Sequence, residues 1–350
     1  MIHLLTIDWL LLLEKLILIA VVVMASLLVA MYETYAERKI AAFMQDRRGP
    51  NRAGIFGILQ PLADGVKLFF KEEIIPNSSN KVLFVLGPSL AMLTAMLTCA
   101  VVPWGGDINL FGRTISLQIA DVNIGILYVF AVVSLGIYGV MIGGWSSNNK
   151  YSLLAALRGA SQVISYELAM GISLIALLMM TGSLSLKTIV KQQMASHWNV
   201  LYQPLAFLIF FVCALAECNR TPFDLSEAES ELNMGYHQEY SSMKLGFYLF
   251  AEYVNMFISS AIMATLFFGG YDIPFFNEVA HTDWGNWLGV LGVACFMIKI
   301  AIFIFVFIWI RWTVPRFRYD QLMNLGWKKL IPLALANMLI TGGVILWLHK

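Results

Sequence analysis

Long apolar segments recur along the whole chain, and they limit its fold more than any other feature. A helix needs about 20 mostly apolar residues to cross the roughly 30 Å hydrocarbon core of a bilayer. Backbone polar groups in lipid must be satisfied within the segment, which favours helices. The sequence therefore predicts an all-α polytopic membrane protein with a single membrane domain, residues 1–350. Eight segments are predicted to span the bilayer: 12–33, 82–103, 124–145, 160–181, 200–218, 245–269, 288–310 and 330–348.

The composition excludes a water-soluble fold. Hydrophobic residues make up 59% of the chain and charged residues 13%, against roughly a quarter charged in an ordinary soluble domain. The net charge of +1 gives no basic surface for nucleic acid. The four cysteines form no CxxC pair, and the sequence has no GxGxxG or GxxxxGK[ST] motif. No metal, iron–sulfur, dinucleotide or NTP site is therefore expected in this chain.

The distribution of Lys and Arg predicts the orientation. The loops after spans 1, 3, 5 and 7 carry 17 of these residues, and the opposite side carries five. Because Lys and Arg are enriched in cytoplasmic loops, loops 34–81, 146–159, 219–244 and 311–329 are predicted to be cytoplasmic, with both termini outside. The loops after even-numbered spans contain Gly, Pro and Asn, and we expect simple turns there.

The first cytoplasmic loop predicts an interfacial amphipathic helix, broken near Pro61. The charged residues at the start of this loop are explained in part by their role in setting the orientation of the chain and by binding to lipid head groups. These roles do not explain the turn Gly49-Pro50-Asn51 or the helix that folds back after it. Together the turn and the helix could line an opening at the cytoplasmic membrane surface for a long isoprenoid ligand with a polar ring. The apolar positions at helical spacing are Ile55, Ile58, Leu59, Leu62, Val66, Phe69 and Phe70.

Ionisable residues inside predicted spans are candidates for function, because an unpaired charge in a bilayer costs several kcal/mol. Glu167, Glu217 and Glu252 lie in spans 4, 5 and 6, and Lys299 lies in span 7. One interpretation is that they pair with one another and only fix packing. Three acids with so few bases cannot all be paired, which favours a hydrated proton relay. For Lys299 both interpretations stay open.

The loop after span 5 is acidic, and only Arg220 opposes its acids. Ser226 with Glu229 fits a capping box, which predicts a short helix that places Glu227 and Glu231 on one face and Glu229 on another. A solvated acidic loop is the plain alternative. The loop begins directly at the end of a span, which favours a functional role over this alternative. In that role, the protonation of the carboxylates responds to a nearby change in charge. The acids are Glu217, Asp224, Glu227, Glu229, Glu231 and Glu239.

Four segments together resemble one family. They are ERKIAAFMQDRRGPNRAGIFGILQPLADGVKLFFKE (37–72), SQVISYE (161–167), AECNRTPFDLSEAESELNMGYHQEY (216–240) and RWTVPRFRYDQLMNLGWKKL (311–330). The resemblance is to the H subunits of bacterial NADH:quinone oxidoreductase (respiratory complex I), the counterparts of mitochondrial complex I subunit 1. It covers nearly the whole chain. The chain departs from the pattern at Asn233-Met234 and at Asn324.

The resemblance implies a membrane-arm subunit that forms the quinone-access tunnel and couples quinone reduction to proton translocation. Residues at tunnel positions of the family are Glu37, Arg38, Asp64, Lys67, Phe223 and Asp224. Residues at relay positions are Glu167, Glu217, Glu227, Glu229, Glu231 and Glu252. Quinone is the implied substrate, whereas NADH, FMN and the iron–sulfur clusters belong to other subunits, so this chain has no complete redox site.

The resemblance also implies partners and a location. The partners are the peripheral quinone-site and terminal-cluster subunits, the small membrane subunits A, J and K, and lipids. The location is the bacterial inner membrane, with both termini periplasmic. Three alternatives remain. One is the anchor subunit of a related membrane-bound hydrogenase, and another is a cation transporter, which would need a pair of broken helices at mid-membrane. The third is a scaffold that only docks the hydrophilic redox arm.

Overall fold

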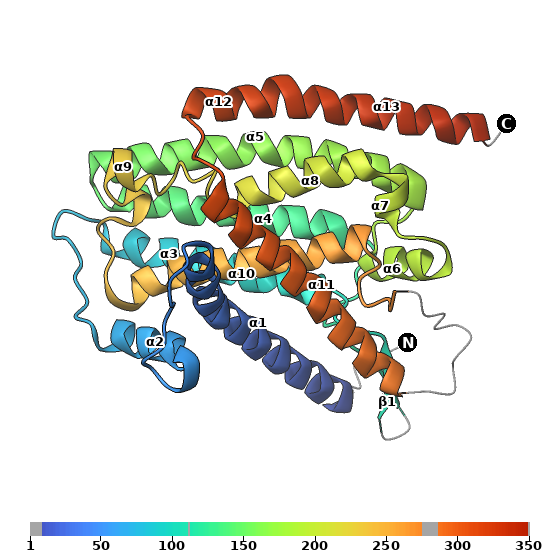
Figure 1. Ribbon diagram of the computed structural model, residues 1–350, viewed down its shortest axis with the longest axis horizontal. Helices are drawn as coiled ribbons and strands as arrows, with labels where there is room; N and C mark the ends of the chain where they lie inside the picture. Colours follow the sequence, from blue (N-terminus) through green and yellow to red (C-terminus); the bar gives the residue numbers. More distant parts are fainter. Residues whose placement is uncertain (1–8, 111–112, 275–285, 349–350) are drawn as a thin grey trace, which may run out of the picture.

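Long helices run side by side through most of the chain in the computed structural model, which describes residues 9–110, 113–274 and 286–348 (Figure 1). The long helices are α1 (Trp9–Met44), α3 (Lys81–Thr98), α4 (Gly125–Ser146), α5 (Lys150–Thr181), α10 (Ser242–Phe267), α11 (Asn286–Thr313) and α13 (Ile331–Leu348). The shorter ones are α2 (Gln60–Phe70), α6 (Leu186–Ala195), α7 (Asn199–Tyr202), α8 (Pro204–Glu217), α9 (Glu229–Leu232) and α12 (Tyr319–Asn324). Single turns occur at Ile55–Gly57, Cys99–Val101, Gly235–His237 and, as a π-helix, Leu325–Leu330.

Seven helices in the described part of the chain are long and apolar enough to cross a membrane, with α12, the π-turn and α13 counted as one. The all-α polytopic fold is thereby confirmed. The predicted span 200–218 differs, because it divides into α7 and α8 at Gln203. Pro204 follows this break and opens α8, since proline cannot donate to the preceding turn. At 14 residues, α8 extends about 21 Å, short of the bilayer core.

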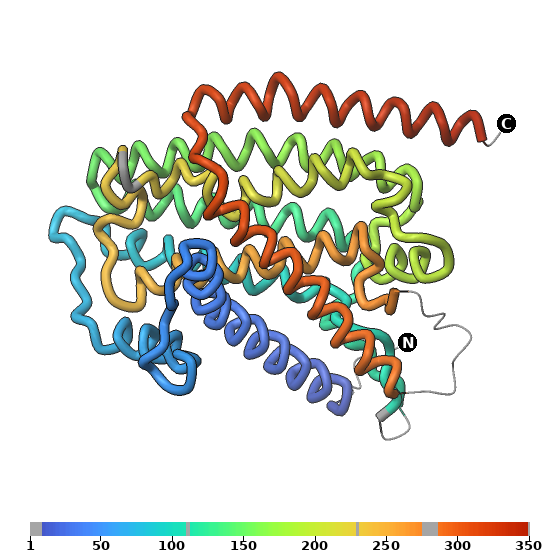
Figure 2. Tube along the Cα trace, in the orientation of Figure 1, coloured from blue at the N-terminus to red at the C-terminus, as the bar shows by residue number. Residues whose placement is uncertain are grey.

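Successive connections alternate between two ends of the bundle. In Figures 1 and 2, α2 and α9 lie at one end, and α6 and β1 (Asp107–Leu110) lie at the other. The loops that carry most of the Lys and Arg residues therefore share one end. The assignment of this end to the cytoplasm, and the single membrane domain with its loop boundaries, stay predictions.

The connections after spans 2 and 4 are more structured than simple turns, so that expectation is wrong for these two. Most of the connection after span 6 lies outside the described residues. After α3 the chain forms a hairpin, in which β1 pairs antiparallel with β2 (Arg113–Ser116). After α5 it forms α6, whose N-cap Ser185 accepts a hydrogen bond from the Thr188 N–H. Polar and apolar residues alternate in β1, which is the pattern of a strand with one covered face.

The amphipathic helix predicted in the first loop begins at Gln60, and Pro61 lies in its first turn rather than breaking it. Proline is well placed there, because the first N–H groups of a helix have no partner within it. Before it, Ile55–Gly57 forms a separate single turn. Phe69 and Phe70 remain largely exposed on this protein, as expected of a helix that lies in the membrane interface.

The most deeply buried helix is α10, whose residues from Val254 to Phe267 nearly all lie in the core. It packs against α1, α3, α8 and α11, while α5 packs against α4, α8 and α13. Small residues let these helices approach closely. A side chain at Gly139 would meet the backbone of Ala91, and one at Gly144 would meet the backbone of Ser152. The acids of the predicted relay lie on or beside these packed helices.

Candidate functional site

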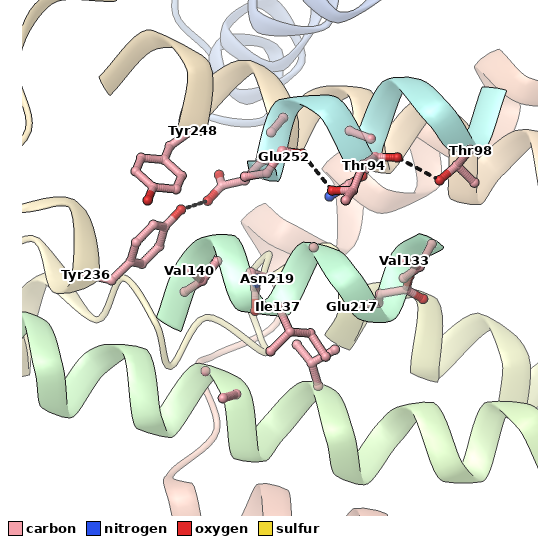
Figure 3. A pocket seen from close by; sticks show the side chains of 18 residues that line it. Thr94, Thr98, Val133, Ile137, Val140, Glu217, Asn219, Tyr236, Tyr248 and Glu252 are labelled. Atoms are coloured by element: carbon pink, nitrogen blue, oxygen red, sulfur yellow. Dashed lines mark hydrogen bonds between the residues drawn. The ribbon is translucent and has the colours of Figure 1, made fainter. Parts of the chain in front are cut away.

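Two cavities lie inside the bundle, among α3, α4, α5, α8 and α10. The first has a volume of about 50 Å³ and the second about 30 Å³. A water molecule needs roughly 10–15 Å³ of such space and polar partners, so each cavity has room for water. The polar residues on the wall of the first are Thr94, Thr98, Glu217, Asn219, Tyr236, Tyr248, Glu252 and Asn255. Figure 3 shows Tyr236 and Glu252 at one end of it and Glu217 at the other.

Glu217 stands where the two cavities meet. It lines both of them, together with Asn255 and Val133. It is the last residue of α8, and the shortness of α8 leaves this helix end within the bundle. Glu167 of α5 interacts electrostatically with Glu217 and accepts a hydrogen bond from the Ser134 hydroxyl of α4.

Glu252 is buried at the opposite end of the first cavity, where the acidic loop meets α10. The Tyr236 hydroxyl donates to Glu252 Oε1 at 3.1 Å. Arg220 Nη2 lies 3.4 Å from Glu252 Oε2, and both side chains are less than a tenth exposed. The Arg220 guanidinium also lies 4.2 Å from the ring centroid of Tyr253. An arginine of the acidic loop therefore opposes the acid of α10.

Two acids of the loop have shifted pKa values in opposite directions. Burial raises the pKa of Asp224 to about 7, and repulsion from Glu227 adds to the shift. Arg316 opposes it through an ion pair with Asp224 at 2.7 Å. Burial also acts on Glu227, but the charges of Arg220 and His237 outweigh it and hold the pKa of Glu227 below its usual value. Neighbouring carboxyls thus have different protonation states near neutral pH.

The capping box at Ser226 is not formed, so the predicted helix arrangement is wrong. The N-cap of α9 is Ala228, and Ser226 is buried against Gly159 of α5. Glu227 lies outside the helix and cannot share its face with Glu231. Packing against α5 overrides the local capping preference, because Ser226 fills the space that a glycine leaves.

Glu231, another relay residue of the loop, is not among the residues that line the cavities. Glu231 is half exposed and pairs with Arg158 Nη1 at 2.9 Å. Glu229 is the first residue of α9, and its side chain lies outside the described part of the structure. Of the six predicted relay acids, the geometry therefore connects Glu167 with Glu217, and Glu227 with Glu252.

A buried glutamine fixes the start of the acidic loop. Gln162 of α5 donates through Nε2 to the carbonyl oxygen of Ala216 at 2.8 Å and to that of Phe223 at 2.7 Å. Phe223 packs between the rings of Tyr166 and Phe317, with centroids 5.3 and 5.4 Å away. Gln162 thus ties the end of α8, next to Glu217, to the part of the loop that holds Asp224.

The predicted tunnel residues fall into two groups. Arg38 Nη1 and Asp64 Oδ2 form an ion pair of 2.7 Å between α1 and α2, and Lys67 is exposed one turn further along α2. Glu37 is buried, pairs with Arg311 and accepts a hydrogen bond from the Tyr253 hydroxyl.

The second tunnel group is buried at the start of the acidic loop. Phe223 and Asp224 are both largely buried there, and Arg316 reaches Asp224 from the segment after α11. Glu37 and Glu252 both act on the charge of Arg220. A chain of charged side chains therefore links the first tunnel group to the cavity acids.

Sequence reasoning missed Glu33. The apolar pattern puts it among the charges that follow span 1, yet α1 continues to Met44 and Glu33 is only 3% exposed. Neither of its carboxylate oxygens has a hydrogen-bond partner among the described residues, and its charge interacts with those of Arg220 and Glu37. The available signal was the spacing of Glu33 and Glu37, which places both on one face of a continuous helix.

The arrangement suits proton transfer. Carboxyl groups that line hydrated cavities exchange protons through water and neighbouring hydroxyls. Among residues 9–110, 113–274 and 286–348, no group of three or more His, Cys, Asp and Glu side chains is placed to hold a metal ion.

Comparison with known proteins identifies the family. Residues 16–342 match the family model described as NADH dehydrogenase. An H subunit of NADH-quinone oxidoreductase from Cytophaga hutchinsonii is 64% identical, over 96% of this chain and 97% of its own. The H subunit from Flavobacterium johnsoniae is 61% identical, over 95% of each chain, and an H subunit from Geobacter metallireducens is 48% identical, over 94% and 95%. The chain therefore belongs to the NADH dehydrogenase family, among the membrane subunits of the NADH-quinone oxidoreductase complex.

Proposed function

We propose that this chain forms the quinone-access tunnel of the complex and couples quinone reduction to proton translocation. The tunnel residues are Glu37, Arg38, Asp64, Lys67, Phe223 and Asp224. Reduction of quinone beside Asp224 changes the local charge and the demand for protons. The acids behind it change protonation in response, and the change passes from Glu227 and Glu252 to Glu217 and Glu167.

The observation that carries this proposal is the pair of cavities that meet at Glu217. They connect Glu252, which the acidic loop contacts through Tyr236 and Arg220, with a carboxyl in the middle of the bundle. Unpaired acids are rare inside membranes, and those present usually mark ion or proton paths. Glu231 pairs with Arg158 at the surface, so we leave it out of the main path.

Glu167 indicates where a membrane partner binds. It is partly exposed on α5 between Ile164 and Leu168, which are about half exposed. A carboxylate at this depth is not stable against lipid, so another polypeptide covers this face in the assembled complex. We assign this face to the small membrane subunits A, J and K, which would continue the proton path.

The end that carries α2 and α9 is proposed to face the cytoplasm of a bacterium, where it contacts the peripheral quinone-site and terminal-cluster subunits. The enrichment of Lys and Arg in the loops at this end supports the orientation, and both termini are then periplasmic. The substrate is a membrane quinone, while NADH, FMN and the iron–sulfur clusters are held by the other subunits. The relatives' names support this enzyme over a hydrogenase anchor or a cation transporter.

Photo-labelling tests the tunnel. A quinone analogue with a photoreactive ring is expected to label this chain in the intact complex, within 37–67 or at 223–224. Native quinone in excess should abolish this labelling, because both compete for one site. Labelling confined to the peripheral subunits would contradict a tunnel in this chain and leave it a docking scaffold.

The pKa of Asp224 predicts a pH dependence. The folded state holds the Asp224 proton more tightly than the unfolded chain does, because burial raises the pKa to about 7. The stability from this group is therefore present below about pH 4 and is lost as the pH rises towards 7. Across pH 7 the carboxyl changes charge beside the proposed tunnel, so the rate of quinone reduction should change there.

The variant Asp224→Asn should remove this inflection, since the amide stays neutral at every pH. The measurement is the rate of NADH-driven quinone reduction in membranes between pH 5.5 and 8.5. Asp107→Asn is the matched control: Asp107 is also ion-paired, but with Lys187 at the opposite end of the bundle. An inflection near pH 7 that persists in Asp224→Asn would assign the titration to another group.

A further inference from the structure

Lys299 of α11 lies inside the bundle, and its ammonium is held by the backbone that follows α10. Its Nζ donates to the carbonyl oxygens of Phe268, Gly270 and Asp272 at 2.8, 2.9 and 2.6 Å. It also lies 5.0 Å from the ring centroid of Trp198. An ammonium has three N–H donors and no acceptor. This geometry suits a permanently charged lysine, which cannot relay a proton while all three N–H groups are bound.

The backbone that binds the Lys299 ammonium follows directly on the wall of the second cavity along the chain. Leu266 lines that cavity and precedes Phe268 by only two residues. The backbone just before Phe268 is bound by other polar side chains. Gln193 Nε2 donates to the Thr265 carbonyl at 2.9 Å, and Asn199 Nδ2 donates to the Leu266 carbonyl at 2.8 Å. The end of the cavity away from the acidic loop is thus closed by apolar side chains, then by a bound polar layer and a cation.

We infer that Lys299 is a fixed positive charge that prevents protons in the second cavity from leaking out through the far end of this chain. A positive charge beside a narrow path raises the energy of a proton on that path, as charged residues do in selective pores. Such a barrier is needed because the second cavity extends from Glu217 to Leu186 of α6. Without a barrier, a proton on Glu217 could leave through this cavity at the end of the bundle that carries α6. The inference rests on the proposed function in one respect, namely that this cavity carries protons.

Lys299→Gln and Lys299→Arg separate the charge from the hydrogen bonds. The glutamine amide still donates to carbonyl oxygens but is neutral, whereas arginine keeps the charge. In the whole complex reconstituted into vesicles without NADH, passive proton flux is measured under an imposed membrane potential. We expect about a tenfold rise for Lys299→Gln, equivalent to about 1.4 kcal/mol in the barrier, and no rise for Lys299→Arg.

Lys187→Met is the matched control. It removes another ammonium at the same end of the bundle, where Lys187 pairs with Asp107 at 2.9 Å, but it leaves the Lys299 site unchanged. Its passive flux should equal that of the unmodified complex. A wild-type flux in Lys299→Gln would overturn the inference, and so would an equal rise in Lys187→Met.

Ile262→Ser decides the question even where Lys299→Gln does not assemble. Ile262 lines the second cavity, so the hydroxyl makes the apolar wall more hydrated while Lys299 is retained. The flux should stay low if the charge is the barrier, and a tenfold rise would show that the apolar wall is the barrier instead. A failure of the proposed proton relay would be seen in a different measurement. The Glu217→Gln complex would then pump protons normally, whatever the passive proton flux of the Lys299 and Ile262 variants.

Discussion

Replacing Arg220 with methionine is expected to destabilise the chain by about 3–5 kcal/mol and to lower the amount of assembled complex severely. The guanidinium lies 3.4 Å from Glu252 with both side chains buried, and it packs on the Tyr253 ring. Removing it leaves a buried carboxylate without its counter-charge, which costs far more than the loss of a surface ion pair. The measurement is the yield of intact complex from membranes and its thermal midpoint.

Arg158→Met is the matched control, because Arg158 also pairs with a loop acid, at 2.9 Å from Glu231, but at the surface. Such a pair contributes about 0–1 kcal/mol, so assembly should be unchanged. The double variant Arg220→Met with Glu252→Gln should recover part of the lost complex, since no buried charge is then left alone. Equal stability of Arg220→Met and the unmodified complex would show that Glu252 does not depend on this arginine.

The long apolar segments determine most of the fold, because about 20 residues without charge have no stable place outside a bilayer or a large core. Sequence alone was sufficient for seven of the eight predicted spans in the described residues, and it placed Glu252 inside one of them. Short elements were missed where their signal is local and weak. The hairpin of β1 and β2 and the 10-residue helix α6 lie in connections that looked like turns, since a four-residue alternation is too short to distinguish a strand from a loop.

The connections among the site residues could not be predicted, because they depend on which helices pack together. Gln162 and Phe223 are 61 residues apart, and nothing in the spacing shows that one binds the other. The buried position of Ser226 follows from Gly159 on another helix, so the capping rule gave the wrong helix start. Glu33 was hidden by the assumption that α1 ends with the apolar run, although a helix with Glu33 and Glu37 on one face continues past it.

Glu217→Gln is expected to reduce redox-driven proton pumping by at least about a hundredfold, the low end of what a proton-transferring group contributes. Glu217 lines both cavities, so its amide substitute interrupts the path at the point where they meet. Glutamine has nearly the same volume and cannot titrate, which leaves packing around α8 largely intact. The measurements are acidification of inverted membrane vesicles during NADH oxidation, and quinone reduction in the same vesicles.

The control must separate a blocked proton path from a damaged complex. Glu73→Gln removes a carboxylate that is half exposed and paired with Lys244, and both activities should remain at the level of the unmodified complex. In Glu217→Gln, electron transfer from NADH to an artificial acceptor upstream of quinone should also stay normal, because we propose that other subunits hold the flavin and the clusters. Normal pumping in an assembled Glu217→Gln complex would exclude Glu217 from the relay, since no carboxyl would then be needed where the two cavities join.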